Sequence, residues 1–433
     1  MAGQTYEAKS LDSWARAKGL RAENYQAIWD AKKEGKILSA GSAITPMELV
    51  AGLGEFEYLP SEPYSANFAG TAPQMIVECQ EATEARGYAR DLCGYMRAYW
   101  GSAFLDKSPF GNFVQPHFYL TEHACDSHGK WYQTLKDNFN IPLFILDLPV
   151  SFNGNKEAQI EYMVSDYQEA IEKMEQVTGR KYDDEKLLEA VEISTENMAL
   201  WAKICLAQTQ VPAPFDAKSL VSLMVPVLLG RWKKETLDFQ RTLLEELEER
   251  VAHNIAHLAT ERGRLLHINT PPWYFLRLLR HPSAYGAVVL GPDVYFQIPG
   301  FFVWSEEGTA LVAGKTPGEA GWELRAREDA LRFIAYRERS RVLADMWLPT
   351  RRITSVVTLA KQSRSDGVIL HFNRGCEAMA MGMGEIKLAL QQEGIPTMDY
   401  DANFADPREF SQVQVIDRME AFLESLGLSR LED

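Results

Sequence analysis

GVILHFNRGCEAMAMGMGEIKLALQQEGIPTMDYD, residues 367–401, holds the pattern that decides the fold class. An apolar run rich in β-branched residues is followed by a short loop, a run with apolar residues at helical spacing, and a second apolar run. Strand, loop, helix and strand in this order form the repeating unit of a parallel sheet. The last residue of the loop, Cys376, is therefore expected where a strand ends and a helix begins.

The same alternation occurs earlier in the chain, where FVQPHFYL leads to EHAC, a helical run and PLFILDLPV. Between these regions the sequence is dominated by long charged and apolar helical patterns. We predict an α/β protein with two Rossmann- or flavodoxin-like parallel-sheet lobes, a helical insert and an N-terminal helical segment. The predicted divisions are 1–154, which carries Cys93 and Cys125, the helical region 155–262, and 263–433, which carries Cys376.

Composition excludes several classes of protein. The 433 residues are 46% hydrophobic and carry a net charge of −15, without a block of Lys and Arg that would mark a nucleic-acid interface. The longest uncharged apolar run, VSLMVPVLLG, is shorter than the roughly 18 residues that a membrane span needs. The first twenty residues are polar and lack the apolar core of a signal peptide. We expect a soluble, cytoplasmic protein with no nucleic-acid or membrane partner.

Two of the five cysteines share one topological position. Cys125 and Cys376 each follow an apolar strand and precede a helix. Ligands of open α/β sheets bind at this edge, and a helix N-terminus stabilises a thiolate through its dipole and its unpaired N–H groups. Such support is what the cysteine ligands of iron–sulfur clusters require. The alternative is that each cysteine is a small buried apolar residue.

The other cysteines differ in their surroundings. Cys93 lies in a predicted helix over 75–101 and can reach the same edge only if this helix breaks near Gly94. Cys79 and Cys205 lie within helical runs, on faces that we assign to packing. No two cysteines form a CxxC pair, so a zinc ribbon or ferredoxin-type site is excluded.

Polar and aromatic residues near these cysteines are further candidates. His123 and His128 flank Cys125 and are either proton donors or cluster neighbours, or else a backbone cap and a solvated side chain. Arg374, beside Asn373, either pairs with a thioester oxygen or makes a surface ion pair. The segment PPWYF, 271–275, either lines an acyl pocket or belongs to the core.

Three segments, RDLCGYMRAYWG, EHACDSHGKWYQTL and HFNRGCEAMAMGMGEIKLAL, resemble the cluster-ligand motifs of the 2-hydroxyacyl-CoA dehydratase and benzoyl-CoA reductase family. Flanking stretches such as SEPYSANFAG and DANFADPREFSQVQVIDRMEAFLESLG resemble that family as well. The resemblance covers most of the chain. In length and detail it is greatest to the larger cluster-binding subunit of ATP-dependent, class I benzoyl-CoA reductases.

The resemblance implies one [4Fe–4S] cluster per chain, held by Cys93, Cys125 and Cys376. It implies a related sister subunit, ATP-hydrolysing iron–sulfur activator subunits, ferredoxin as the indirect electron donor, and an aromatic acyl-CoA substrate. The expected reaction is dearomatisation to a cyclic diene by low-potential single electrons, in anaerobic aromatic degradation. We expect His123 to transfer a proton, and Asn373 and Arg374 to bind substrate.

Two alternatives remain. A 2-hydroxyacyl-CoA dehydratase would use the same cysteines in a ketyl-radical mechanism, and cysteine spacing does not separate the two reactions. A cluster-free structural subunit of the same fold would be colourless and insensitive to loss of Cys93. The chain itself lacks an ATP site, since GTALVAGKT, residues 308–316, has the wrong glycine spacing for a phosphate loop.

Overall fold

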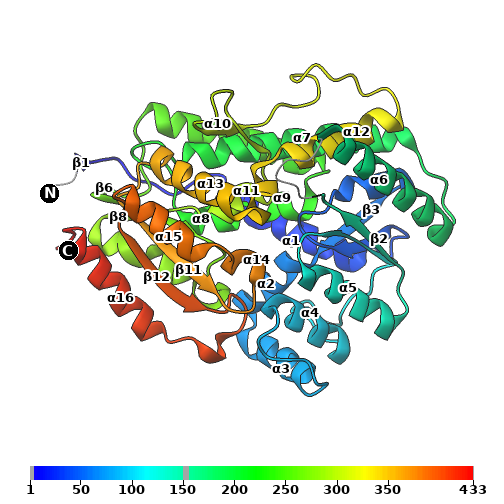
Figure 1. Cartoon of the computed structure of the whole chain (residues 1–433), viewed down its shortest axis with the longest axis horizontal. Coiled ribbons are helices and arrows are strands. Elements are labelled where there is room, and N and C mark those ends of the chain that lie inside the picture. Colours follow the sequence, from blue (N-terminus) through cyan, green and yellow to red (C-terminus); the bar gives the residue numbers. More distant parts are fainter. Residues whose placement is uncertain (1–3, 150–155, 433) are drawn as a thin grey trace.

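The computed structural model describes residues 4–149 and 156–432. Figure 1 shows two α/β lobes, one built from the N-terminal part of the chain (blue to cyan) and one from the C-terminal part (orange to red). A layer of helices, mostly green, lies along one side of both lobes. The predicted fold class, two parallel-sheet lobes with a helical region, is confirmed.

The first sheet has the strand order β3–β2–β4–β5, with all strands parallel. Its strands are β2 (Ile37–Gly41), β3 (Phe56–Pro60), β4 (Phe118–His123) and β5 (Leu143–Asp147). The chain leaves β2 toward β3 on one side and later enters β4 on the other, so the order reverses between β2 and β4. Ligands bind at such switch points, outside the carboxyl ends of the strands. Ser42 and Cys125 both follow strands at this point.

The second sheet repeats this topology with the order β12–β11–β7–β8, again all parallel. Its strands are β7 (Gly263–Ile268), β8 (Ala287–Leu290), β11 (Gly367–Asn373) and β12 (Thr397–Ala402). Every residue of β7 and β8 is buried, as expected when helices cover both faces of a parallel sheet. The switch point lies between β7 and β11, beside Asn269 and Cys376.

The helical layer consists of α6 (Lys156–Thr178), α7 (Asp184–Ala207), α8 (Ala217–Leu223), α9 (Val225–Gly230) and α10 (Lys234–Ala252). The N-terminal helix α1 (Trp14–Asp30) packs against α8, α9 and α10. Helix α12 (Arg327–Ser340) comes much later in the chain but packs on α6 and α7 (Figure 1). The helical layer therefore includes residues from all three predicted divisions of the chain.

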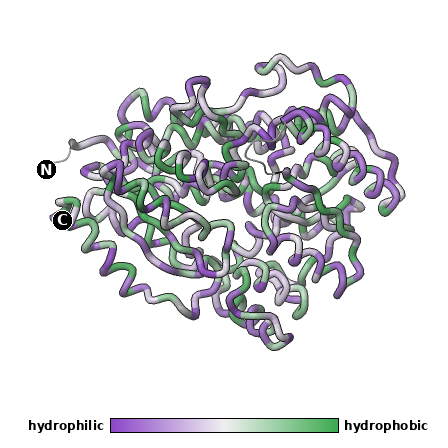
Figure 2. The backbone as a smooth tube through the Cα atoms, viewed as in Figure 1, coloured by the Kyte–Doolittle hydropathy of each residue, from purple (hydrophilic) through white to green (hydrophobic). Residues whose placement is uncertain are grey.

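The remaining elements complete the layers around the two sheets. Figure 2 shows that hydrophobic and hydrophilic residues alternate along the peripheral helix α16, which buries Val415, Met419, Phe422 and Leu423. The elements not named above are α2 (Ser61–Thr71), α3 (Pro73–Glu84), α4 (Gly94–Leu105), α5 (Asp126–Phe139), α11 (Asp293–Gln297), α13 (Pro349–Gln362), α14 (Glu377–Ala380), α15 (Met383–Gln392), α16 (Gln412–Ser425), η1 (Met47–Leu53), η2 (Trp273–Tyr285), η3 (Val342–Trp347), η4 (Pro407–Glu409), β1 (Gln4–Thr5), β6 (Thr260–Glu261), β9 (Phe302–Trp304) and β10 (Leu311–Ala313).

The predicted helix over 75–101 is broken in two. Helix α3 ends at Glu84 and α4 begins at Gly94, which places Cys93 immediately before a helix. The predicted division at 154 and 155 lies outside the described residues, and β7 begins at the division predicted after 262. None of the described helices is long and apolar enough to cross a membrane.

Candidate active site

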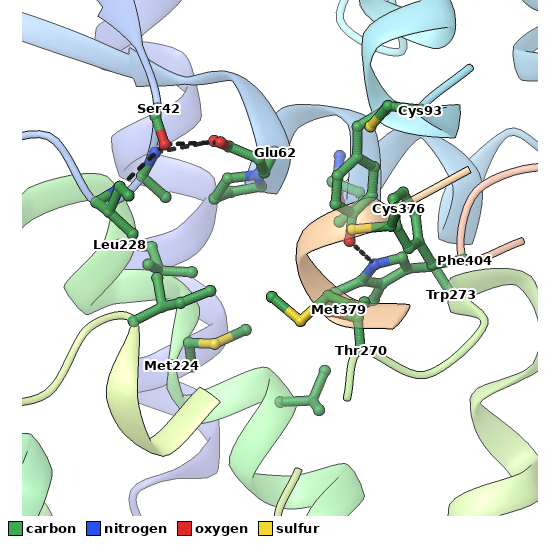
Figure 3. Close-up of a pocket in the computed structure, with 18 of the residues that line it drawn as sticks. Ser42, Glu62, Cys93, Met224, Leu228, Thr270, Trp273, Cys376, Met379 and Phe404 are labelled. Atoms are coloured by element: carbon green, nitrogen blue, oxygen red, sulfur yellow. Dashed lines mark hydrogen bonds between the residues drawn. The ribbon is translucent and has the colours of Figure 1, made fainter. Parts of the chain in front are cut away.

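A cavity of about 450 Å³ lies where the two lobes and the helical layer meet. Its walls come from loops that follow strands of both sheets, from α1 and α2, and from the apolar helices α8 and α9. Figure 3 shows Cys93 and Cys376 on one side of this cavity, with Met224 and Leu228 on the opposite side. The third motif cysteine, Cys125, also lines it.

Each of the three cysteines is the residue immediately before a helix. Cys93 precedes α4, Cys125 precedes α5 and Cys376 precedes α14. The first N–H groups of a helix have no partner within the helix and carry its positive dipole end. Three helix starts from two lobes therefore direct positive dipole ends toward the sulfur atoms in one cavity. The helix break that the sequence required for Cys93 is what brings the third cysteine here.

Two glycines allow the loops of Cys93 and Cys376 to approach each other. A Cβ atom on Gly94 would lie 2.2 Å from Asn403 Oδ1, in the loop after β12. Gly375 has φ +72°, and its Cβ would lie 2.7 Å from the carbonyl oxygen of Asp91 and 2.9 Å from that of Leu92. At Gly375 the φ angle and the two backbone oxygens leave room only for glycine, whereas at Gly94 a Cβ atom would have to displace the Asn403 side chain. The neighbouring cysteines of the two lobes meet because these positions carry no side chain.

The thiols of Cys93 and Cys376 lie in an apolar environment. Burial raises the pKa of Cys93 to about 12 and also raises that of Cys376; Cys125 raises the pKa of Cys93 again, and Cys93 and then Cys125 raise that of Cys376. The N–H groups of Tyr95 and Met96 beside Cys93, and of Met379 beside Cys376, act in the opposite direction. Thiols with raised pKa values, such as the buried Cys93 and the partly buried Cys376, are deprotonated when a metal centre binds them, because the ion supplies the missing positive charge.

Cys125 has the opposite electrostatic surroundings. Burial acts to raise its pKa, but the neighbouring His128 imidazolium outweighs this effect and the net pKa is lowered. His128 in turn has a strongly raised pKa, since its desolvation is outweighed by Cys125 and by Glu62, whose Oε1 lies 2.6 Å from His128 Nε2. The cavity therefore contains a histidine with a raised pKa placed between a cysteine and a carboxyl group whose pKa values are both lowered.

Glu62 is held in place by the loop after β2. Ser42 Oγ donates to Glu62 Oε1 at 2.7 Å, and the N–H of Ala43 donates to Oε2 at 2.8 Å. Burial acts to raise the pKa of Glu62, yet His128, Ser42 and Ala43 together lower it. No oxygen atom of the described residues accepts a hydrogen bond from His128 Nδ1. Ser42, Glu62 and His128 thus form a partly buried acid–base unit beside Cys125.

Buried arginines hold the loops at both switch points. Arg352 Nη1 donates to the carbonyl oxygens of Ala378, Met379 and Met381, at 2.9–3.1 Å, directly after Cys376. Its Nη2 donates to Asn269 Oδ1 at 2.5 Å. In the first lobe Arg231 donates from Nη1 to the carbonyl of Ala43 at 3.4 Å and from Nη2 to that of Thr45 at 2.5 Å, after β2.

The other sequence candidates lie apart from the cavity lining. His123 has a side chain 44% exposed, and its Nδ1 lies 3.3 Å from Asp147 Oδ1. Asn373 is buried and donates to the carbonyl of Thr270 at 3.2 Å, while Arg374 is exposed at the end of β11. The described residues that line the cavity include none of these three. Of the PPWYF segment, Trp273 and Tyr274 do line it.

Sequence reasoning missed Ser42, Glu62 and both buried arginines, and it gave His128 little weight. Ser42 directly follows a strand at a switch point, and this position in the sequence could have indicated that it belongs to the site. Nothing local marks Glu62, Arg231 or Arg352, because their partners lie far away in the chain. Cys79 and Cys205 are buried in α3 and α7 outside the cavity lining, in agreement with their assignment to packing.

The chain is similar to known acyl-CoA dehydratase subunits over most of its length. Residues 43–426 match the family model described as 2-hydroxyglutaryl-CoA dehydratase, D-component. The chain is 27% identical to the (R)-2-hydroxyisocaproyl-CoA dehydratase alpha subunit of Clostridioides difficile, over 94% of each chain. It is 27% identical to the (R)-2-hydroxyglutaryl-CoA dehydratase alpha subunit of Acidaminococcus fermentans, over 93% of this chain and 94% of that one.

A benzoyl-CoA reductase subunit of Thauera aromatica is 22% identical, over 96% of this chain and 95% of the reductase chain. The likeness to these two dehydratase alpha subunits is thus greater than the likeness to the reductase, although chain length and the flanking stretches favoured the reductase. The range that the family model matches includes all three cysteine loops. The match over residues 43–426 shows that this chain belongs to the family of the 2-hydroxyglutaryl-CoA dehydratase D-component.

Proposed function

We propose that this chain is the cluster-binding, alpha-type subunit of a 2-hydroxyacyl-CoA dehydratase. One observation carries the proposal: Cys93, Cys125 and Cys376 precede three helices of two lobes and line one cavity together with a buried Glu62–His128 pair. The greater identity to dehydratase alpha subunits favours dehydration over reduction.

The three thiols fit a [4Fe–4S] cluster by their chemistry. The described residues offer no group of three His, Cys, Asp or Glu side chains arranged around a single metal ion. The thiolates of a cubane cluster stand farther apart than the ligands of one ion, and each needs N–H or dipole support, which the helix starts supply. Three cysteines leave one iron for an exchangeable ligand. A bound cluster would supply single electrons at low potential to a CoA thioester.

The chain's own residues would perform the remaining work. Dehydration removes the hydroxyl group at C2 and a hydrogen at C3 of the acyl chain as water. The His128 imidazolium keeps one proton on Nε2 against Glu62 and would donate its other ring proton to the departing hydroxyl group, with Cys125 beside it as the competing acceptor. Glu62, anchored by Ser42 and Ala43, then holds the neutral imidazole in place through the proton that remains on Nε2. The apolar wall excludes water that would consume low-potential electrons.

The partners follow from the proposed reaction. The relatives are named as alpha subunits, so we propose a sister subunit in a hetero-oligomer, with a separate ATP-hydrolysing iron–sulfur activator and ferredoxin as the indirect donor. The proton-transfer role that the sequence suggested for His123 is better suited to His128, because His128 lines the cavity and His123 is exposed.

A dearomatising benzoyl-CoA-type reductase is the second candidate. It is favoured by the aromatic side chains around the cysteines, since Tyr95, Trp131, Trp273 and Phe404 line the cavity. Electron stoichiometry separates the two reactions. A reductase consumes electrons at every turnover, whereas a dehydratase needs electrons only to start and then recycles them.

Iron and acid-labile sulfide per chain test the cluster, measured after anaerobic purification with the natural partners. We expect about four of each per site in the wild type and loss of both in Cys376→Ser, together with the brown absorbance. Cys205→Ser is the control, because that thiol is also unpaired with another cysteine but is buried in α7 away from the cavity lining. Wild-type protein without iron, or equal iron in Cys376→Ser, would remove the cluster from the proposal.

A further inference from the structure

We infer that the substrate is a CoA thioester whose acyl group is uncharged and apolar, bound against α8, α9 and η3, with Arg21 facing the anionic CoA moiety at the mouth. This inference rests on the proposed function and names the substrate class of the same cavity. The family includes relatives named for a dicarboxylic acyl group and for a branched apolar one, so membership alone does not decide between them.

Burial orders the cavity from its mouth to its inner end. Gly70 and Thr71, at the end of α2, are exposed, and Arg21 on α1 is half-buried. At the inner end Met224 and Leu228 are only 2% and 3% exposed. Figure 3 shows these two side chains across the cavity from Cys93 and Cys376. A thioester held near the cysteines therefore places its acyl chain among the buried side chains and its CoA moiety toward solvent.

The inner end is apolar on every element that forms it. Helices α8 and α9 supply Val221 and Leu228, Met224 lies between them, and η3 supplies Leu343 and Met346. Among the described residues that line the cavity, Arg21 is the only Arg or Lys. The nearby Arg231 is already engaged by Glu48 and by two carbonyl oxygens. A carboxylate at the end of an acyl chain would be desolvated here without a cationic partner.

The charges that do line the cavity also disfavour a dicarboxylate. Glu62 and Glu377 are both lining residues, and the pKa of Glu62 is lowered, so it is an anion at neutral pH. A carboxylate on the acyl chain would be repelled by these side chains. The positive charge of His128 does not compensate, because His128 is already paired with Glu62. An uncharged branched or aromatic chain meets only apolar contacts and gains from their burial.

Arg21 suits the opposite end of the ligand. It lies on α1 at the partly exposed side of the cavity, and the described residues place no carboxylate within ion-pair distance of it. Phosphate groups are the anions that every CoA thioester carries, whatever its acyl group. Arg21 should therefore contribute to the binding of all CoA thioesters equally and not select among acyl chains.

Equilibrium binding tests the inference without turnover. The anaerobically purified complex with its sister subunit is titrated calorimetrically with isocaproyl-CoA and with glutaryl-CoA, which have acyl chains of similar length. We expect isocaproyl-CoA to bind at least about ten-fold more tightly. Glutaryl-CoA binding equally or more tightly would overturn the apolar acyl site while leaving a CoA-thioester enzyme in place. Absence of binding by either thioester would overturn the proposed function itself.

Two variants locate the effect. Leu228→Arg should reduce or reverse the preference for isocaproyl-CoA over glutaryl-CoA, because it places a cation at the inner end of the cavity. Arg21→Gln should weaken the binding of both thioesters by a similar factor and leave the ratio of their dissociation constants unchanged. A selective loss of glutaryl-CoA binding in Arg21→Gln would show that Arg21 reads an acyl carboxylate, and would overturn the proposed orientation. If Leu228→Arg does not fold, the wild-type ratio and Arg21→Gln still decide the question.

Discussion

Cys125 and Cys376 occupy equivalent places in the two lobes, yet the pKa values of their thiols are shifted in opposite directions. Each follows the third strand of a sheet with the same order and starts the next helix, beside the switch point. Cys125 has a lowered pKa because His128 lies next to it, whereas burial raises the pKa of Cys376. Topology thus repeats the position of a ligand, while the side chains packed around it set its chemistry.

The two lobes also hold their switch-point loops by similar means. Arg231 reaches from the helical layer to the loop after β2, and Arg352 reaches from α13 to Asn269 and to the carbonyls after Cys376. Both guanidinium groups are buried. The difference is in compensation: Arg231 has the carboxylate of Glu48 at 3.2 Å, but Arg352 is bound mainly by neutral oxygens. Arg352 also interacts with the buried Asp293, so it lies between that carboxyl group and the loop of Cys376.

The largest loss of stability is expected when Arg352, which supports the loop of Cys376 in the second lobe, is replaced. Arg352→Met removes a donor from the carbonyls of Ala378 and Met381 and from Asn269 Oδ1, while the Met379 carbonyl keeps Asn269 Nδ2, so we expect a loss of about 3–5 kcal/mol of stability. The loop of Cys376 should lose order first, and iron content should fall with it. The urea midpoint of unfolding and the iron content of the anaerobic protein measure the two effects.

Its neighbour Arg351 is the matched control for that variant. The Arg351 side chain is 45% exposed and pairs with Asp345 at 3.1 Å, so Arg351→Met should cost less than about 1 kcal/mol. Equal destabilisation by the two variants would mean that Arg352 acts through general packing of α13 and not through the cysteine loop.

A slightly smaller effect is expected at the first-lobe support, and it depends on pH. Burial acts to raise the pKa of Glu48, but Arg337 and Arg231 outweigh it and lower the pKa to about 2. Because the folded-state pKa lies below the unfolded value, this carboxylate stabilises the fold above about pH 4.5, and the contribution disappears as pH falls toward 2. The shift corresponds to roughly 3 kcal/mol at neutral pH.

Glu48→Gln should therefore differ from the wild type most at pH 7 and least near pH 2. Urea midpoints at pH 7, 5 and 3 measure the difference curve, in which other titrating groups cancel. A difference in urea midpoint that stays constant from pH 7 to pH 3 would show that Glu48 contributes by packing and hydrogen bonding instead of charge.

The smallest effect is expected on the difference in pKa between the thiols of Cys125 and Cys376. His128→Gln removes the imidazolium, so burial should raise the pKa of Cys125 and make it resemble Cys376. In cluster-free protein at pH 7, alkylation of Cys125 by iodoacetamide should slow by about ten-fold or more, since each unit of pKa changes the thiolate fraction ten-fold. Peptide mapping by mass spectrometry gives the rate for each cysteine.

His123→Gln is the control, because His123 is exposed and pairs with Asp147 instead of a cavity residue. It should leave the alkylation of Cys125 unchanged. The assignment of the proton role to His128 would be wrong if the two histidine variants slowed alkylation equally.

Much of this architecture could be predicted from local patterns. Apolar runs, turn residues and helical spacing indicated two parallel-sheet lobes, and they placed Cys125 and Cys376 at strand ends because that position depends only on element order. The prediction for Cys93 depended on a helix break beside Gly94, which the structure contains. The predicted roles of His123, Asn373 and Arg374 rested on nearness in sequence to a cysteine, and those side chains lie outside the cavity lining.

Order along the chain was enough for the fold class and for two of the three cysteine positions, since a strand end and a helix start are local features. Convergence of the three thiols, the lowered pKa of Cys125 and the support from Arg231 and Arg352 depend on contacts between residues far apart in sequence. Desolvation and Coulomb interactions act through space, and the close approach at Gly94 and Gly375 exists only once both lobes are packed. These features of the site were therefore settled by tertiary structure.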